Sequence, residues 1–276
     1  MRRLLAFLFC CTALLFMPTD TQAQRGWEGG GWIGISNYCG DLNTNFDLDQ
    51  PGIATGVNAR YNFNERVCLK FSGNLANVSA DDSNSRNAFE RARNLNFQSQ
   101  IWDGAAQLEF NFLPYLHGSR ESFLSPYLFG GFNVFNFNPQ TIYEDQIVDL
   151  RPLRTEGQFI EYANTRLGFV YGLGMKISFN YRWSINIEIS GRALGTDYLD
   201  DVSTVFADPD DVENQTGTIG AALSNRSLEV AGVDNADFSP GRQRGNSFNN
   251  DSYIMTGISL MYYFGDLMCP SISGRR

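Results

Sequence analysis

The stretch IATGVNARYNFNERVCLKFSGNL, residues 53–75, decides the fold class because it contains two alternating runs joined by a short turn. From Ile53 to Phe63, every second side chain is mostly apolar, and the side chains between them are small or polar. Residues 67–75 repeat the pattern after the turn. Alternation with a period of two is typical of a β-strand whose two faces meet different environments. The stretch therefore predicts a β-hairpin with one apolar and one polar face.

Alternation of the same kind recurs along the chain, at residues 105–112, 167–179, 185–192 and 254–264. Two further segments are less regular. Residues 30–39 are rich in glycine, and residues 127–137 are apolar on both faces, which leaves the register of that strand open. The total is about eight strands of roughly ten residues or more, the length that a tilted barrel strand needs to cross a bilayer.

Short turns alternate with long polar connections between these strands. The turns span residues 62–66, 113–123 and 180–182, and the long connections span residues 41–51, 81–96, 139–164 and 197–251. Outer-membrane barrels have this asymmetry, with short periplasmic turns and long external loops. We therefore predict an all-β fold: a transmembrane antiparallel up-and-down β-barrel of about eight strands, with long external loops and both chain ends in the periplasm. A soluble eight-stranded barrel or sandwich with an apolar interior stays open, because it shares the alternation.

The polar face of the predicted strands carries charges of both signs, at Arg60, Lys70, Glu109, Lys176, Glu188 and Arg192. Since an eight-stranded barrel leaves little room inside, we expect these side chains to fill the lumen with ion pairs rather than to line an open channel. Aromatic residues near the strand ends predict girdles in contact with membrane lipid. They are Trp27, Trp32, Tyr61, Phe63, Phe112, Tyr115, Tyr181, Trp183, Tyr262, Tyr263 and Phe264.

A targeting segment precedes the strands. Arg2 and Arg3 are followed by an apolar run at residues 4–17 and by the small-residue end Thr21-Gln22-Ala23. This is the pattern of a secretory signal peptide, and the run is shorter than the ~20 residues of a membrane-spanning helix. We expect a signal peptide over residues 1–23, the barrel over residues 24–265 and a periplasmic C-terminal tail over residues 266–276.

Composition and charge argue against several classes of function. The formal net charge of -9 disfavours nucleic-acid binding, which needs a basic surface. His117 is the only histidine, and we place it in a short turn without catalytic partners, so we expect no enzyme activity. The acidic run from Asp197 to Asp211 lacks the spacing of a calcium loop, so we expect neither a metal nor a cofactor. We expect this loop to fold over the barrel mouth, with a short helix within residues 217–230.

Three cysteines follow the expected cleavage site, Cys39, Cys68 and Cys269. The periplasm is oxidising, and an odd number leaves one thiol without an intramolecular partner. An intermolecular bridge from Cys269, a bridge between Cys68 and Cys269, and free thiols all stay open.

Several motifs resemble, in their order, those of the PorG-like outer-membrane barrels. The matching segments are Tyr38-Cys39-Gly40-Asp41-Leu42-Asn43, Ser125-Pro126-Tyr127 with Gly130-Gly131, residues 150–158, residues 183–203, residues 223–226, Arg244-Gly245 and residues 262–266. Each motif alone is weak, but together they cover almost the whole chain after the signal peptide.

This resemblance implies a component of the type IX secretion system, which exports proteins across the outer membrane and supports gliding motility. The chain would then be an outer-membrane anchor or adaptor for a periplasmic ring, built from a lipoprotein (PorK-like) and its partner (PorN-like). The expected partner-binding residues lie in the tail, at Asp266, Leu267, Met268 and Cys269. A small outer-membrane porin or a ligand or adhesion barrel unrelated to secretion is the alternative, and an outer-membrane enzyme is the third.

Overall fold

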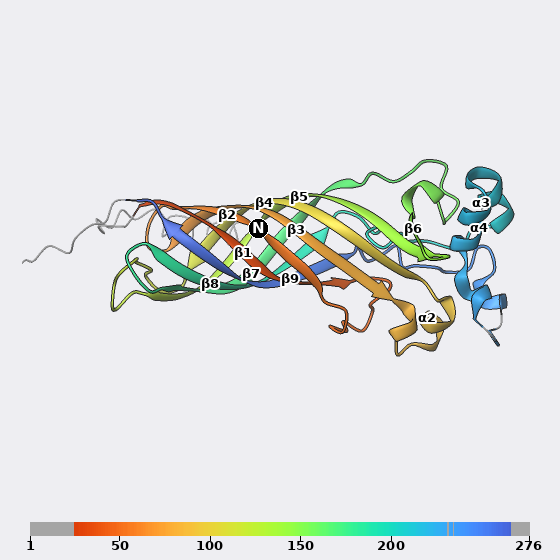
Figure 1. Cartoon of the computed structure of the whole chain (residues 1–276), viewed down its shortest axis with the longest axis horizontal. Helices are drawn as coiled ribbons and strands as arrows, with labels where there is room; N and C mark the ends of the chain where they lie inside the picture. The colour runs from red at the N-terminus through yellow and green to blue at the C-terminus, as the bar shows by residue number, and fades with distance from the viewer. Residues whose placement is uncertain (1–24, 231, 234, 266–276) are drawn as a thin grey trace, which may run out of the picture.

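Eight antiparallel strands close into a barrel (Figure 1) in the computed structural model, which describes residues 25–265 except residues 231 and 234. They are β1 (Gly26–Cys39), β2 (Gly52–Asn62), β3 (Val67–Asp81), β4 (Asn96–Asn111), β5 (Leu124–Tyr143), β7 (Thr165–Ser178), β8 (Trp183–Leu194) and β9 (Ser252–Tyr263). Each barrel strand pairs with the next along the chain, and β1 also pairs with β9. A further short strand, β6 (Gln146–Asp149), forms a hairpin with the end of β5. The predicted up-and-down barrel is confirmed.

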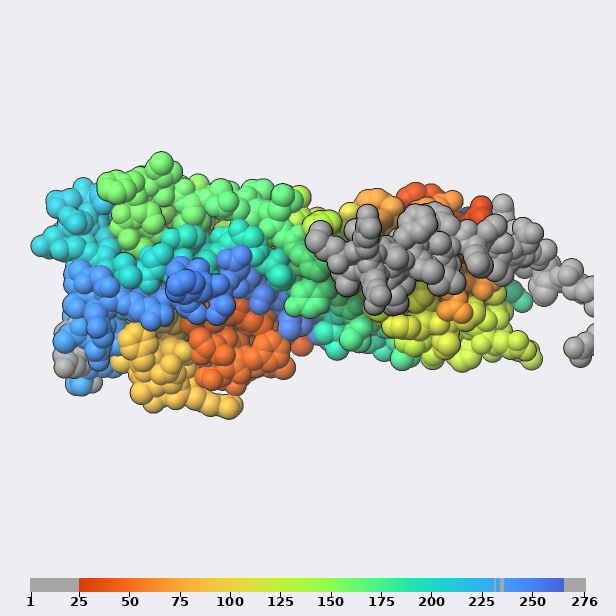
Figure 2. All heavy atoms as spheres, turned by 180° about the vertical axis from the view of Figure 1, so that it is seen from behind, coloured from red at the N-terminus to blue at the C-terminus, as the bar shows by residue number. Residues whose placement is uncertain are grey.

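The two ends of the barrel differ. At the short-turn end, residues 63–66, 112–123 and 179–182 join the strands, and β1 begins and β9 ends there. At the other end, the connections 40–51, 82–95, 144–164 and 195–251 form what we call the cap (Figure 1). Figure 2 shows these segments, far apart in the sequence, gathered at one end of the molecule.

Short helices occur in the long connections. They are η1 (Asp82–Asn84), α2 (Ala88–Arg93), η2 (Arg151–Leu153), α3 (Pro209–Thr216), α4 (Thr218–Ser224), η3 (Arg226–Glu229) and η4 (Asn235–Phe238). Helix α4 lies within the segment predicted to contain one, whereas α3 was not predicted. The start of α3 nevertheless has ordinary signals, because the Asp208 side chain accepts a hydrogen bond from the Asp210 amide and Pro209 follows it. Among the described residues, the helices are too short or too polar to cross a membrane.

The outer wall of the barrel is apolar over a band of limited height. On β4 the outward side chains from Trp102 to Phe112 are apolar or small, whereas Gln98 and Gln100 face outward beyond Trp102. Ten residues at about 3.3 Å each, in a strand tilted by about 40°, span about 25 Å, the height of the apolar band of outer-membrane barrels. The exposed wall is thus apolar and the interior charged, so the soluble alternative is wrong and the barrel is a transmembrane one.

Three of the predicted girdle aromatics point inward instead. Tyr115 and Tyr263 are buried, and the Trp32 indole donates a hydrogen bond to the Asn74 side chain at 2.8 Å inside the barrel. Residue 32 shares the inward face of β1 with Glu28, a periodicity that the surrounding glycines conceal in the sequence. The other predicted girdle residues lie on the outer surface or in the short turns.

The register of β5, left open by the sequence, follows from what lies inside. Its inward side chains include Tyr127, Phe129, Phe135 and Phe137, all buried. Phe135 and Phe137 join an apolar cluster that fills the lumen toward the cap and continues into the cap at Leu199. The strand is apolar on both faces because one meets lipid and the other meets this cluster. Ion pairs therefore fill only part of the lumen, and the part nearest the cap is apolar.

Candidate functional site

The charges inside the barrel converge on Glu109. Its carboxylate lies 2.6 Å from the Lys176 ammonium, 2.7 Å from the Arg60 guanidinium and 3.5 Å from the Lys70 ammonium. The four side chains come from β4, β7, β2 and β3, whose alternation points each of them inward. One buried carboxylate therefore links four strands.

The network extends from Glu109 in both directions along the lumen. Toward the short turns, Arg60 lies 3.1 Å from Glu28. Toward the barrel centre, Lys70 lies 2.6 Å from Glu188, which also accepts a hydrogen bond from the Tyr127 hydroxyl at 2.8 Å. Five of the six residues predicted to pair inside the lumen are thus joined in one chain of contacts.

The sixth, Arg192, has a different partner. Its guanidinium lies 3.4 Å from Asp103, which also accepts hydrogen bonds from Asn74 and Asn133. Sequence reasoning missed both Glu28 and Asp103. The strand periodicity could have identified them, because Glu28 shares its face with Trp32 and Asp103 shares its face with Glu109. We call these eight charged residues the lumen network: Glu28, Arg60, Lys70, Asp103, Glu109, Lys176, Glu188 and Arg192.

His117 corrects another expectation. The turn that carries it folds into the barrel mouth, so the imidazole is buried, lies 3.1 Å from Glu28 and stacks on Tyr263 at 4.8 Å between ring centroids. The residue predicted to lie in a turn without partners therefore extends the lumen network at the short-turn end.

Aromatic rings and glycines pack the network closely. The Lys70 ammonium lies 4.8 Å from the Phe129 ring centre and that of Lys176 lies 4.7 Å from the Tyr127 ring centre. A Cβ atom at Gly174 would approach the Tyr127 ring to 2.7 Å, so glycine is needed there for the ring to fit. The cavity beside Lys70, Glu188 and Arg192 has a volume of ≈ 20 Å³, which is room for a single water molecule.

The cysteines form no disulfide among the described residues. Cys39 and Cys68 are free thiols, and Cys68 is fully buried, with its sulfur 3.5 Å from the Lys176 ammonium. Cys269 lies outside the described residues, as do the other predicted partner-binding residues, Asp266, Leu267 and Met268.

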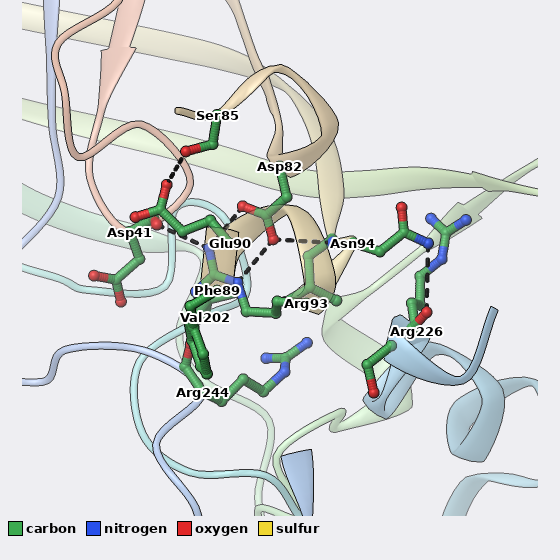
Figure 3. A network of polar contacts seen from close by, with 12 residues as sticks. Asp41, Asp82, Ser85, Phe89, Glu90, Arg93, Asn94, Val202, Arg226 and Arg244 are labelled. Carbon is green, nitrogen blue, oxygen red and sulfur yellow. Dashed lines mark hydrogen bonds and ion pairs between the residues drawn. The ribbon is translucent and has the colours of Figure 1, made fainter. Parts of the chain in front are cut away.

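A second polar site lies in the cap, where Arg93 of α2 joins three connections (Figure 3). Its guanidinium pairs with Asp82 at 2.7 Å and donates to the backbone carbonyls of Asp41 at 2.9 Å and Arg244 at 2.6 Å. Since Asp41 and Arg244 both lie in segments matched by the sequence motifs, these motifs meet in space.

The acidic motif after β8 is held against the connection between β5 and β7. Asp201 accepts hydrogen bonds from Thr155 at 2.5 Å and from Tyr162 at 2.7 Å. Glu156 accepts from the backbone amide of Ser203 at 2.8 Å and pairs with Arg244 at 3.1 Å. The expectation that this loop folds over the barrel mouth is confirmed.

The cap buries more negative than positive charge. Among the described residues its buried carboxylates are Asp41, Asp82, Glu90, Glu156, Asp197, Asp200, Asp201 and Asp251, and its buried cations are Arg93 and Arg244. We call these ten residues the cap cluster. Burial raises the pKa of Asp197 to about 7 and that of Asp201 to about 6, and it raises the pKa of Asp41 as well.

Within residues 25–265 as described, no group of three His, Cys, Asp or Glu side chains is arranged to hold a metal ion.

Comparison with protein families finds one match, to the family described as "Domain of unknown function (DUF6089)", over residues 2–205. No curated protein sequence matches the chain. Among solved structures, Neisserial surface protein A is similar, with 9% identity and a TM-score of 0.44 over 87% of this chain and 97% of that chain. OprG of Pseudomonas aeruginosa has 10% identity and a TM-score of 0.42, over 90% and 100% of the two chains. Ail of Yersinia pestis has 9% identity and a TM-score of 0.39, over 88% and 99%. The strand pairing, and not these low scores, establishes the fold.

Proposed function

The chain belongs to the DUF6089 family, and we propose that it is a non-enzymatic anchor in the outer membrane, where it serves the type IX secretion system. In this proposal the short-turn end faces the periplasm, and its turns and the tail contact the periplasmic ring. The cap then faces the outside of the cell.

The filled lumen is the observation that carries the anchor role. The lumen network crosses the barrel from β2 to β8, and the apolar cluster that includes Phe135 and Phe137 closes it toward the cap. An eight-stranded barrel whose interior is filled by ion pairs and aromatic rings has little room for a channel. This supports a role as an attachment point in the membrane rather than as a pore.

The type IX assignment depends on the motif resemblance, and the structure adds a reason why those motifs occur together. Residues 38–43, 150–158 and 196–203 and Arg244 interact with one another in the cap. Shared motifs of this kind support a shared cap, and hence a relationship with the PorG-like barrels.

A deletion strain tests the assignment. Loss of the gene is expected to stop export of type IX cargo, and the tagged protein is expected to copurify with the ring lipoprotein. A variant truncated after Gly265 should lose this copurification while its barrel still folds, whereas Asp211→Asn in the exposed part of the cap should retain it. Normal cargo export in the deletion strain would reject the type IX role.

The porin alternative keeps one supporting observation, the small polar cavity beside Lys70 and Glu188. Planar bilayers containing the purified protein distinguish the two functions. An anchor is expected to give no conductance, and steady conductance that changes in Glu188→Gln would favour the porin.

A further inference from the structure

At the centre of the cap cluster, one hydroxyl group lies between two buried carboxylates. The Tyr38 hydroxyl is 2.6 Å from Asp200 and 2.8 Å from Asp251. The second oxygen of each carboxylate accepts a backbone amide, from Val202 and from Leu199 respectively. These contacts join the end of β1 to both ends of the connection between β8 and β9.

This arrangement requires a proton beyond that of the tyrosine. A hydroxyl has one hydrogen to donate, so it can satisfy only one of two ionised carboxylates. If Asp251 is protonated, it donates to the Tyr38 oxygen, and Tyr38 donates to Asp200. Both hydrogen bonds of the Tyr38 hydroxyl can therefore form in the closed cap only when one of the two carboxyl groups keeps its proton.

The surroundings favour that proton. The ionisable groups facing the pair from neighbouring segments are Asp41, Asp197, Cys39, Tyr162 and Arg93. The Arg93 guanidinium already pairs with Asp82. Burial raises the pKa of both carboxyl groups well above the usual value, and nearby negative charges add to this effect, that of Asp251 at Asp200 and those of Asp197 and Asp41 at Asp251.

We propose that the cap is a proton-dependent lid, held closed over the barrel mouth by the Tyr38–Asp200–Asp251 contact and released when its carboxyl groups ionise. This inference concerns the cap alone and does not depend on the secretion role.

The direction of the pH dependence follows from proton binding. The closed cap binds protons that its open form, with solvated carboxylates, releases, so closure is favoured at low pH and weakens as pH rises. Asp201 and Asp197, with pKa values of about 6 and about 7 in the closed cap, lose their contribution as the pH rises from about 4, the ordinary pKa of an aspartate, to pH 6 and pH 7 respectively. Asp200 and Asp251, whose pKa values are raised well above the usual value, extend the loss to higher pH. Each proton released on opening changes the opening equilibrium by up to about tenfold per pH unit.

Limited proteolysis of the full-length protein in lipid nanodiscs tests this proposal. Cleavage within residues 197–251 is followed by mass spectrometry between pH 5.5 and 9, in EDTA-containing buffer, and is normalised to cleavage of an unstructured peptide at each pH. The wild-type rate is expected to rise at least tenfold across this range. Asp251→Asn should flatten the part of the rise above pH 7, because the amide donates to Tyr38 without titrating and its oxygen still accepts from Leu199.

Two further variants keep the test decisive. Asp200→Asn probes the same pair from the other side and should also flatten the rise, so a folding failure in one variant leaves the other. Asp211→Asn changes an exposed carboxylate of α3 and should behave as the wild type. A normalised wild-type rate that is constant with pH, or a full pH response in both Asp200→Asn and Asp251→Asn, would overturn the proposal.

Discussion

The lumen network and the cap cluster are two buried polar sites in one molecule, and they differ in the balance between carboxylates and cations. In the lumen network four carboxylates face four cations, all of them inside the wall of the barrel. In the cap cluster eight buried carboxylates share two buried arginines. The lumen is therefore neutral by pairing, whereas the cap needs bound protons to reduce its charge.

The difference follows from the elements that carry the side chains. Neighbouring strands hold their inward residues at fixed heights, so Arg60 and Lys70 are directly paired in the sheet and both reach Glu109. The cap consists of connections whose backbone amides and carbonyls also need partners, and carboxylates such as Glu156 satisfy several amides at once. Carboxylates are thus frequent in the cap because they accept hydrogen bonds from backbone amides as well as forming ion pairs with arginine.

The largest expected effect comes from Glu109→Gln, which breaks the balance of the lumen network. The amide leaves Arg60 and Lys176 buried without their shared counter-charge, and removing one partner of a buried ion pair costs about 3–5 kcal/mol. Urea unfolding in detergent micelles, followed by the gel mobility of folded and unfolded barrels, measures this loss. Glu121→Gln, in the exposed part of a short turn, is the control and should leave the midpoint unchanged. Equal midpoints for both variants would mean that the network does not stabilise the barrel.

Arg244→Ala is expected to act on the cap and not on the barrel. It removes the cation paired with Glu156 and a donor to the Asp201 carbonyl, contacts to charged groups that contribute about 1.5–3 kcal/mol each. Proteolysis within residues 197–251 should become faster at pH 7, while the gel mobility of the folded barrel stays the same. Arg242→Ala removes an exposed pair with Asp237 and should have little effect. A loss of barrel stability in Arg244→Ala would show that the two sites are coupled.

Strand periodicity explains why the barrel and most of the lumen network could be predicted from the sequence. A period of two assigns each residue to one face, which correctly placed Arg60, Lys70 and Glu109 inside without any knowledge of their partners. It could not predict that Arg192 pairs with Asp103 rather than with Glu188, because that choice depends on the relative heights of strands distant in the sequence.

The contacts within the cap could not be predicted from strand periodicity. Its contacts join residues separated by up to 213 positions, as Tyr38 and Asp251 are, and no local period links them. The spacing of the acidic residues after Asp197 does not indicate which of them are buried, yet Asp200 and Asp201 are buried. Only the folded barrel brings their partners, Tyr38 and Tyr162, to the same place.

Gly174→Ala tests whether the lumen network depends on close packing as well as on charge. The added methyl group would approach the Ile187 carbonyl to 2.6 Å and the Tyr127 ring to 2.7 Å, and overpacking of this kind costs about 1–3 kcal/mol. The urea midpoint should fall. Gly104→Ala is the matched control, because its methyl group would meet no atom within 4 Å on the outer wall. A fall of the same size in both variants would indicate a general effect of glycine on the strands and not packing in the lumen.

The smallest effect is expected from Tyr162→Phe, which keeps the ring stacked on Tyr198 and removes only the hydrogen bond to Asp201. That bond favours the ionised carboxylate, so its loss should raise the pKa of Asp201 above its value of about 6. A group with a raised pKa in the closed state loses its contribution as pH rises, so the variant should resemble the wild type at pH 5 and open more readily at pH 8, by about 1 kcal/mol. Normalised proteolysis at the two pH values measures this. An equal change at pH 5 and pH 8 would show that the hydrogen bond stabilises the cap without acting through the protonation of Asp201. The excess of buried carboxylates over arginines in the cap cluster would then contribute less to the pH dependence of the cap than the comparison with the lumen network implies.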